Sequence, residues 1–249
     1  MARLWDLGCL GVMEQQGEHG PELLAYFAEE IDTGVAGVWL DLPEVDYVAK
    51  YQAGLKPVRV GPLVVAPSHA EVTLSDGDAV LWLDPGSAFG TGHHETTYLA
   101  LEALTGLDLS GLGVLDVGSG SGVLAIAADL LGAERSLGID VDPATLPVAR
   151  ANAARNRARA RFALGGLDMA AGLPLKFDLI VANLYAELHA NLFPRYAAHL
   201  APGGRLLLTG ILASLRQAVT QAAPETVELA AERSRGDWLL LEYCLRRRG

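Results

Sequence analysis

The stretch "VLDVGSGSGVLAIAA", residues 114–128, places an apolar run before Gly118, Gly120 and Gly122 and a second apolar run after them. The first run is typical of a strand that is buried on both faces, and the second has the length and composition of a helix. Glycines in such a turn let a ligand approach the backbone, and the start of the following helix offers free N–H groups. The stretch therefore predicts a nucleotide site at the carboxyl edge of a parallel sheet.

The acidic residues around this loop indicate which nucleotide it binds. A dinucleotide loop has the spacing G-x-G-x-x-G, but Val123 occupies the place of the third glycine. Asp116 lies two residues before the first glycine, where a carboxylate would repel a pyrophosphate and attract an ammonium group. Asp140, at the tip of the next expected strand, can accept hydrogen bonds from both ribose hydroxyls. The ribose contact of Asp140 fits either cofactor, whereas Val123 and Asp116 favour S-adenosylmethionine over NAD.

Strands and helices alternate through the rest of the chain. The expected strands are 113–117, 135–140, 161–164, 177–182, 204–209, 226–231 and 238–245, and the expected helices are 121–131, 143–156, 185–200 and 212–222. Repeated strand–helix units with apolar strands predict an α/β fold whose mainly parallel sheet is covered on both faces. The last two strands have no helix between them, which predicts a hairpin and one antiparallel strand. A further hairpin is expected from residues 71–74 and 79–83.

The N-terminal part has a different pattern. It predicts a strand at 8–15, a helix at 21–31 and a second strand at 35–40, which together would make a small α+β domain. Helical spacing followed by two prolines then indicates a linker. The expected parts are a small domain at 1–41, a linker helix and loop at 42–60, and a larger α/β domain at 61–249.

Composition limits the possible partners. The net charge of −11 argues against a general nucleic-acid binder, because phosphate contacts require clustered Lys and Arg. Cys9 and Cys244 offer neither a disulfide framework nor metal-ligand spacing. No apolar run approaches the roughly 18 residues that span a membrane, and the first residues lack the pattern of an export signal. We expect a cytoplasmic monomer with no membrane or direct nucleic-acid partner.

Four segments together resemble one family. They are "AFGTGHHETT", "LDVGSGSGVLAIAA", "GIDVDP" and "VANLYAEL", in this order. They resemble the ribosomal protein L11 methyltransferases, which are bacterial class I enzymes that depend on S-adenosylmethionine. The likeness covers about residues 45–249. The glycine loop is common to all class I methyltransferases, whereas the first segment is more specific.

The resemblance implies a role for several residues. Phe89 would lie beside the nucleoside, and Thr97 would hydrogen-bond the cofactor from the first turn of a helix. Gly118 and Gly120 would pass under the methionine part of the cofactor, and Asp140 would hold the ribose. Asp168 would contact the adenine amino group, and Asn183 would approach the methionine end and the methyl acceptor. From the residues alone, Asn183 is equally consistent with a cap on the following helix. His93 and His94 have no further ligands at suitable spacing, so we expect loop or helix-cap roles and no metal.

The family resemblance implies methyl transfer to amines of ribosomal protein L11, with the small N-terminal domain recognising that substrate. Compared with the family pattern, we expect the N-terminal part here to be short and to lack an opening strand and helix. No His, Asp or Glu is uniquely placed as a general base. Three alternatives remain: a class I methyltransferase of another protein or a small amine, a nicotinamide-dependent oxidoreductase, and a binding module without activity.

Overall fold

The computed structural model forms two compact units, Met1–Asp46 and Tyr47–Gly249. It describes residues 7, 9, 11–17, 20–28, 30–34, 37–40, 56–84, 94–170 and 176–246. The division after Asp46 falls within the predicted linker. The linker helix predicted at 42–54 lies outside the described residues, so the expected domain boundaries stay predictions.

The first unit contains a hairpin in which β1 (Gly11–Gly17) pairs antiparallel with β2 (Gly20–Tyr26). The helix predicted at 21–31 is therefore wrong. A short apolar run fits a helix or a strand by its spacing, and here pairing with β1 decides for the strand. The strand predicted at 35–40 is also wrong over residues 37–40, the part of it that the structure describes.

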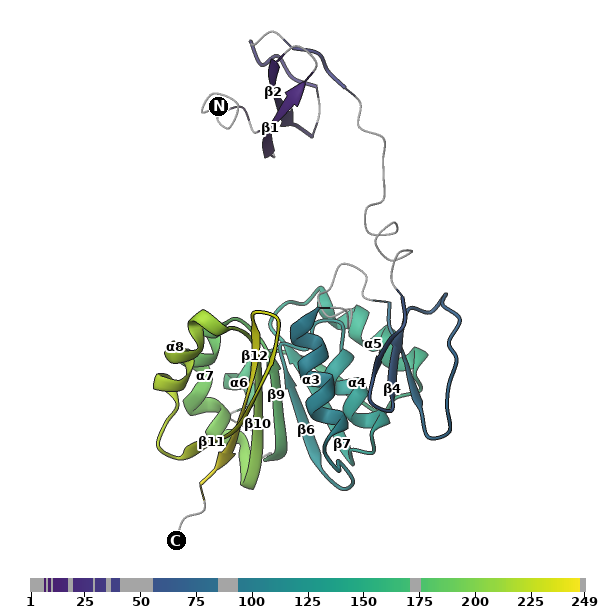
Figure 1. Cartoon of the computed structure of the whole chain (residues 1–249), viewed down its shortest axis with the longest axis vertical. Helices are drawn as coiled ribbons and strands as arrows, with labels where there is room; N and C mark the ends of the chain where they lie inside the picture. Colours follow the sequence, from purple (N-terminus) through teal and green to yellow (C-terminus); the bar gives the residue numbers. More distant parts are fainter. Residues whose placement is uncertain are drawn as a thin grey trace. The chain divides into compact units, whose positions relative to one another are not determined.

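The second unit is built on a seven-stranded sheet with the order β11-β12-β10-β9-β6-β7-β8 (Figure 1). Its strands are β6 (Gly113–Val117), β7 (Arg135–Asp140), β8 (Arg161–Leu164), β9 (Phe177–Asn183), β10 (Leu200–Leu212), β11 (Val227–Arg235) and β12 (Trp238–Leu245). β12 runs antiparallel to both of its neighbours, and the other neighbouring pairs are parallel. The predicted α/β fold, its C-terminal hairpin and its one antiparallel strand are confirmed.

Helices cover both faces of this sheet. They are α3 (Glu95–Thr105), α4 (Val123–Leu130), α5 (Thr145–Arg155), α6 (Leu167–Ala170), α7 (Ala186–His199), the short 3-10 helix η1 (Ala213–Leu215) and α8 (Arg216–Ala222). Successive strand residues belong to different cores: Val114 belongs to the core that includes residues of α3, α4 and α5, and Leu115 belongs to the core that includes residues of α7 and α8. Both kinds of position are therefore apolar. No helix in the described part of the chain is long and apolar enough to cross a membrane.

A separate three-stranded sheet precedes α3 and consists of β3 (Val58–Val60), β4 (Leu63–Ala66) and β5 (Ala79–Trp82). The hairpin predicted between 71–74 and 79–83 is wrong, because residues 71–74 form no strand and β5 pairs in parallel with β4. The completely buried β4 offers an apolar partner that the exposed segment before β5 cannot match.

Candidate active site

A cleft of about 720 Å³ opens at the carboxyl ends of the parallel strands. The glycine loop, the ends of β7 and β9 and the start of α7 line it, together with Trp238 at the start of β12. This is the edge at which parallel α/β sheets bind their ligands, because loops and helix N-termini converge there.

The glycine loop follows β6 and is shaped by backbone geometry that other residues rarely adopt. Gly118 has φ of 75°, and a Cβ atom on it would lie 2.5 Å from Cδ2 of Leu184. The loop is closed by a hydrogen bond from the Gly122 N–H to the Ser119 carbonyl, at 2.7 Å. Glycine at position 118 therefore leaves room for Leu184 to pack against the loop, and both residues line the cleft.

Asp116 lies in the wall of the cleft and is buried. Its Oδ2 accepts a hydrogen bond from the N–H of Ala125 at 3.1 Å, whereas Oδ1 has no partner among the described residues. Burial is the main cause that raises the pKa of Asp116 to about 7; the hydrogen bond from Ala125 acts to lower this pKa, and the nearby charge of Asp140 acts to raise it. A buried carboxylate oxygen without a donor fits a ligand that brings an ammonium group.

Asp140 ends β7 and is held in place by two backbone N–H groups. Gly120 donates to its Oδ2 at 2.8 Å, and Asp142 donates to its Oδ1 at 2.9 Å. Each carboxylate oxygen retains a further lone pair that can accept a hydroxyl. The structure therefore joins the two predicted elements, the glycine loop and the acid at the second strand, through one hydrogen bond.

Asn183 ends β9 and lines the cleft. Its Nδ2 donates to the hydroxyl of Thr97 at 3.3 Å. It is not the cap of α7, because Tyr185 occupies that position and makes no side-chain cap. Thr97 lies in the first turn of α3, as predicted, but it is fully buried, and its neighbour Thr96 lines the cleft.

Asp168 lies in α6 and also lines the cleft. Its carboxylate pairs with Arg195 of α7 at 2.7 Å, and both side chains are about half exposed or more. Phe89 and His93, also singled out in the sequence, lie outside the described residues.

His94 caps α3, as the sequence suggested: its Nδ1 accepts from the N–H of Thr96 at 3.3 Å. Its ring packs edge to face on Trp238, with centroids 5.0 Å apart, and both line the cleft. Sequence reasoning missed Trp238, which no motif marks, and Tyr185, which lies within the quoted "VANLYAEL" segment. The described residues contain no cluster of potential metal ligands.

Comparison with known proteins agrees with this geometry. The family model of ribosomal protein L11 methyltransferase (PrmA) matches residues 13–245. A ribosomal protein L11 methyltransferase from Thermus thermophilus is 48% identical over 246 residues, covering 96% of this chain and 92% of that protein. Another from Deinococcus radiodurans is 44% identical over 254 residues, covering 96% and 91%. The crystal structure of a ribosomal protein L11 methylase from Lactobacillus delbrueckii subsp. bulgaricus has a TM-score of 0.71 at 32% identity and covers 78% of this chain and 100% of that chain. The chain therefore belongs to the ribosomal protein L11 methyltransferase family.

Proposed function

We propose how this cleft holds S-adenosylmethionine and directs its methyl group to an amine of ribosomal protein L11. As a member of its family, the chain is an S-adenosylmethionine-dependent methyltransferase of ribosomal protein L11.

The observation that carries the cofactor assignment is the free Oδ1 of Asp116 in the cleft wall. The ammonium group of the methionine part would satisfy this oxygen, and Asp140 would accept the ribose hydroxyls. Gly118 and Gly120 would let the methionine part lie against the backbone. Asp168 would accept from the adenine amino group while it remains paired with Arg195. A role for Phe89 beside the nucleoside stays a prediction.

The acceptor would reach the cleft at Asn183. A lysine amine, with a pKa near 10.4 in water, must be neutral to attack the methyl group, which bound S-adenosylmethionine carries on a sulfonium. The apolar lining by Leu184, Leu188 and Trp238 disfavours the charged ammonium. Because the amide nitrogen of Asn183 donates to Thr97, its amide oxygen is the atom that would accept from the amine. Positioning and desolvation, rather than a dedicated base, would then account for the rate.

The first unit would recognise the protein substrate, with a linker in the predicted range 42–60. The acceptors would be lysine side chains, the N-terminal α-amine, or both. We place the reaction in the cytoplasm, where ribosomal proteins are made. The alternative is a substrate other than L11, either another protein or a small amine.

The test is methyl incorporation from labelled S-adenosylmethionine into purified L11, together with calorimetric titration of S-adenosylmethionine and NAD. We expect L11 labelling and binding of S-adenosylmethionine alone. Labelling of another protein or of small amines in preference to L11 would overturn the substrate assignment. Preferential binding of NAD would overturn the cofactor site.

A further inference from the structure

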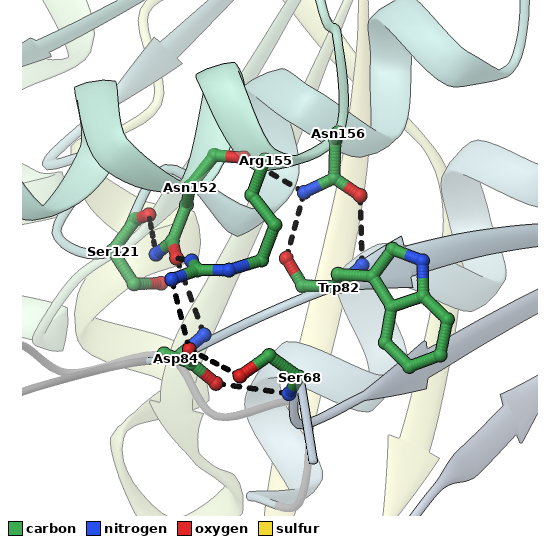
Figure 2. Close-up of polar contacts among 7 residues, drawn as sticks. All are labelled: Ser68, Trp82, Asp84, Ser121, Asn152, Arg155 and Asn156. Atoms are coloured by element: carbon green, nitrogen blue, oxygen red, sulfur yellow. Dashed lines mark hydrogen bonds and ion pairs between the residues drawn. The ribbon is translucent and has the colours of Figure 1, made fainter. Parts of the chain in front are cut away.

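A polar network lies next to the cleft and includes none of the residues that line it. It joins the end of β5, the loop after β4 and helix α5 to the glycine loop. Its members are Ser68, Trp82, Asp84, Ser121, Asn152, Arg155 and Asn156 (Figure 2). We infer that Asn152 is a positioning residue that fixes the glycine loop for the cofactor through the carbonyl of Ser121.

Asn152 is completely buried, and each end of its amide has a partner. The Nδ2 donates to the Ser121 carbonyl at 2.9 Å. The Oδ1 accepts from the N–H of Asp84 at 3.2 Å and from Arg155 at 2.7 Å. One side chain of α5 therefore connects the glycine loop to the end of β5.

The Ser121 carbonyl matters because its peptide leads into Gly122, which has φ of 83° and is the N-cap of α4. The N–H of that same peptide group donates to Ser119. With its carbonyl held by Asn152 and its N–H held by Ser119, the peptide cannot rotate without losing two buried hydrogen bonds. Gly120, between these points, is held by Asp140, the acid proposed for the ribose.

Asp84, Ser68 and Arg155, which lie on the side of the network away from the glycine loop, hold Asn152 in position. Asp84 pairs with Arg155 at 2.9 Å and accepts from the Ser68 hydroxyl at 2.6 Å and the Ser68 N–H at 3.0 Å. Burial acts to raise the pKa of Asp84, but the hydrogen bonds from Ser68 and the charge of Arg155 outweigh it and lower that pKa. Asp84 therefore stays ionised at neutral pH, and Arg155 remains bound between it and Asn152.

Asn156 provides a matched control one turn further along the same helix. Its Oδ1 accepts from the N–H of Trp82 and its Nδ2 donates to the carbonyl of Trp82, both at 2.7 Å. It also joins α5 to β5, and the further hydrogen bond of its Nδ2 goes to the carbonyl of Asn152 in its own helix, at 2.8 Å, rather than to the glycine loop. Asn152→Ala and Asn156→Ala thus each remove links between α5 and β5, and only the first releases Ser121.

A charge-conserving exchange separates the two functions of Asn152, which are to hold the Ser121 carbonyl and to join α5 to the end of β5. In the double variant Asp84→Asn/Asn152→Asp, an acid still faces Arg155, but the donor to Ser121 is lost and a carboxylate faces its carbonyl. If anchoring of β5 were all that mattered, this variant would bind the cofactor as the wild type does.

The experiment measures the Kd of S-adenosylmethionine by calorimetry, the melting temperature, and kcat at saturating cofactor with L11. We expect Asn152→Ala and the double variant to raise the Kd about tenfold, as loss of a buried hydrogen bond does, with kcat within about twofold. Asn156→Ala should lower the melting temperature comparably and keep the Kd. Unchanged Kd in both Asn152 variants, or an equal rise in Asn156→Ala, would overturn the inference. The inference rests on the proposed cofactor site, and failure of the wild type to bind S-adenosylmethionine would overturn that site as well.

Discussion

At the residue scale, Asp116 and Asp140 lie in the same cleft and have different roles because their surroundings differ. Asp140 receives two backbone hydrogen bonds, which hold its carboxylate in a fixed orientation. Asp116 receives one and is buried, so its ionised form is costly until a cation arrives. Asp140 is therefore suited to bind hydroxyl groups, and Asp116 is suited to bind an ammonium group.

Asp116 gives the cofactor affinity a pH dependence. With a pKa raised to about 7 by burial, the carboxylate of the free protein is mostly protonated at pH 6 and half ionised at pH 7. Because the ionised form binds an ammonium, we expect S-adenosylmethionine affinity to rise about fivefold between these pH values. Calorimetry of the wild type and Asp116→Asn checks this. The variant should bind more weakly and without that rise, and an equally steep rise in the variant would contradict the assignment.

Ionisation of Asp116 strengthens cofactor binding as pH rises, but it lowers the stability of the free protein. A carboxyl whose folded pKa exceeds its unfolded value contributes stability that is complete below about pH 4 and is lost as pH rises to about 7. Asp116→Asn cannot ionise. In the absence of cofactor, the free energy of unfolding of Asp116→Asn minus that of the wild type should therefore increase as pH rises from 5 to 8. Urea denaturation at each pH measures this difference.

Asn183→Ala tests the acceptor site. Loss of the amide should lower single-turnover methyl transfer by on the order of a hundredfold, because a misplacement of about 1 Å of a reacting group can cost that much. The Kd of S-adenosylmethionine should change far less. Thr97→Ser, which keeps the hydroxyl that accepts from Asn183, is the control and should retain most of the rate. A transfer rate in Asn183→Ala close to that of the wild type would remove Asn183 from the site.

At the element scale, the glycine loop depends on close contact with the turn between β9 and α7. Leu184 lines the cleft and leaves no room for a side chain at Gly118, which also has a left-handed backbone. The loop is thus fixed by β6 before it, by α4 after it and by side chains from β7, α5 and the β9–α7 turn.

Gly118→Ala should therefore have two effects. The left-handed backbone should cost about 1–2 kcal/mol of stability, and displacement of Leu184 should weaken S-adenosylmethionine about tenfold. Gly203→Ala is a matched control, since Gly203 has φ of 77° and no atom within 4 Å of a Cβ placed there. Thermal unfolding and calorimetry on both variants should show a similar loss of stability and a loss of affinity only at Gly118. Equal affinities would place the loop away from the cofactor.

At the scale of the whole molecule, the two units divide the proposed work. The described residues that line the cleft all belong to the unit Tyr47–Gly249, as do both large hydrophobic cores. The first unit has a hairpin and exposes several large apolar side chains, among them Val38 and Leu40. Chemistry and substrate recognition should therefore be separable.

Deletion of residues 1–46 tests this separation. We expect the shortened chain to fold and to bind S-adenosylmethionine within about twofold of the full chain, because its cores and cleft remain. Methylation of L11 should fall by on the order of a hundredfold in kcat/KM, as expected when a tethered recognition module is removed. Melting temperature, calorimetry and labelling of L11 measure the three properties. A shortened chain that methylates L11 at the full rate would assign substrate recognition to the second unit.

The sequence by itself determined the parallel sheet, its one antiparallel strand and the positions of Asp116, Gly118, Asp140 and Asn183 at the carboxyl edge. These features are local, because an apolar strand, a glycine turn and a helix follow one another directly in the chain. The same reasoning allowed two readings of Asn183, and only the observed cap of α7 at Tyr185 set the helix-cap reading aside.

Tertiary structure alone decided the features that depend on a partner far away in the chain. The segment of β2 is a strand because β1 pairs with it, and β5 pairs with the buried β4 rather than with its nearer neighbour. Trp238 joins the cleft, and Asn152 reaches Ser121, without any motif that marks them. Periodicity reports which face of a segment is apolar. It does not report which other segment covers that face, and packing between distant residues fixes these contacts.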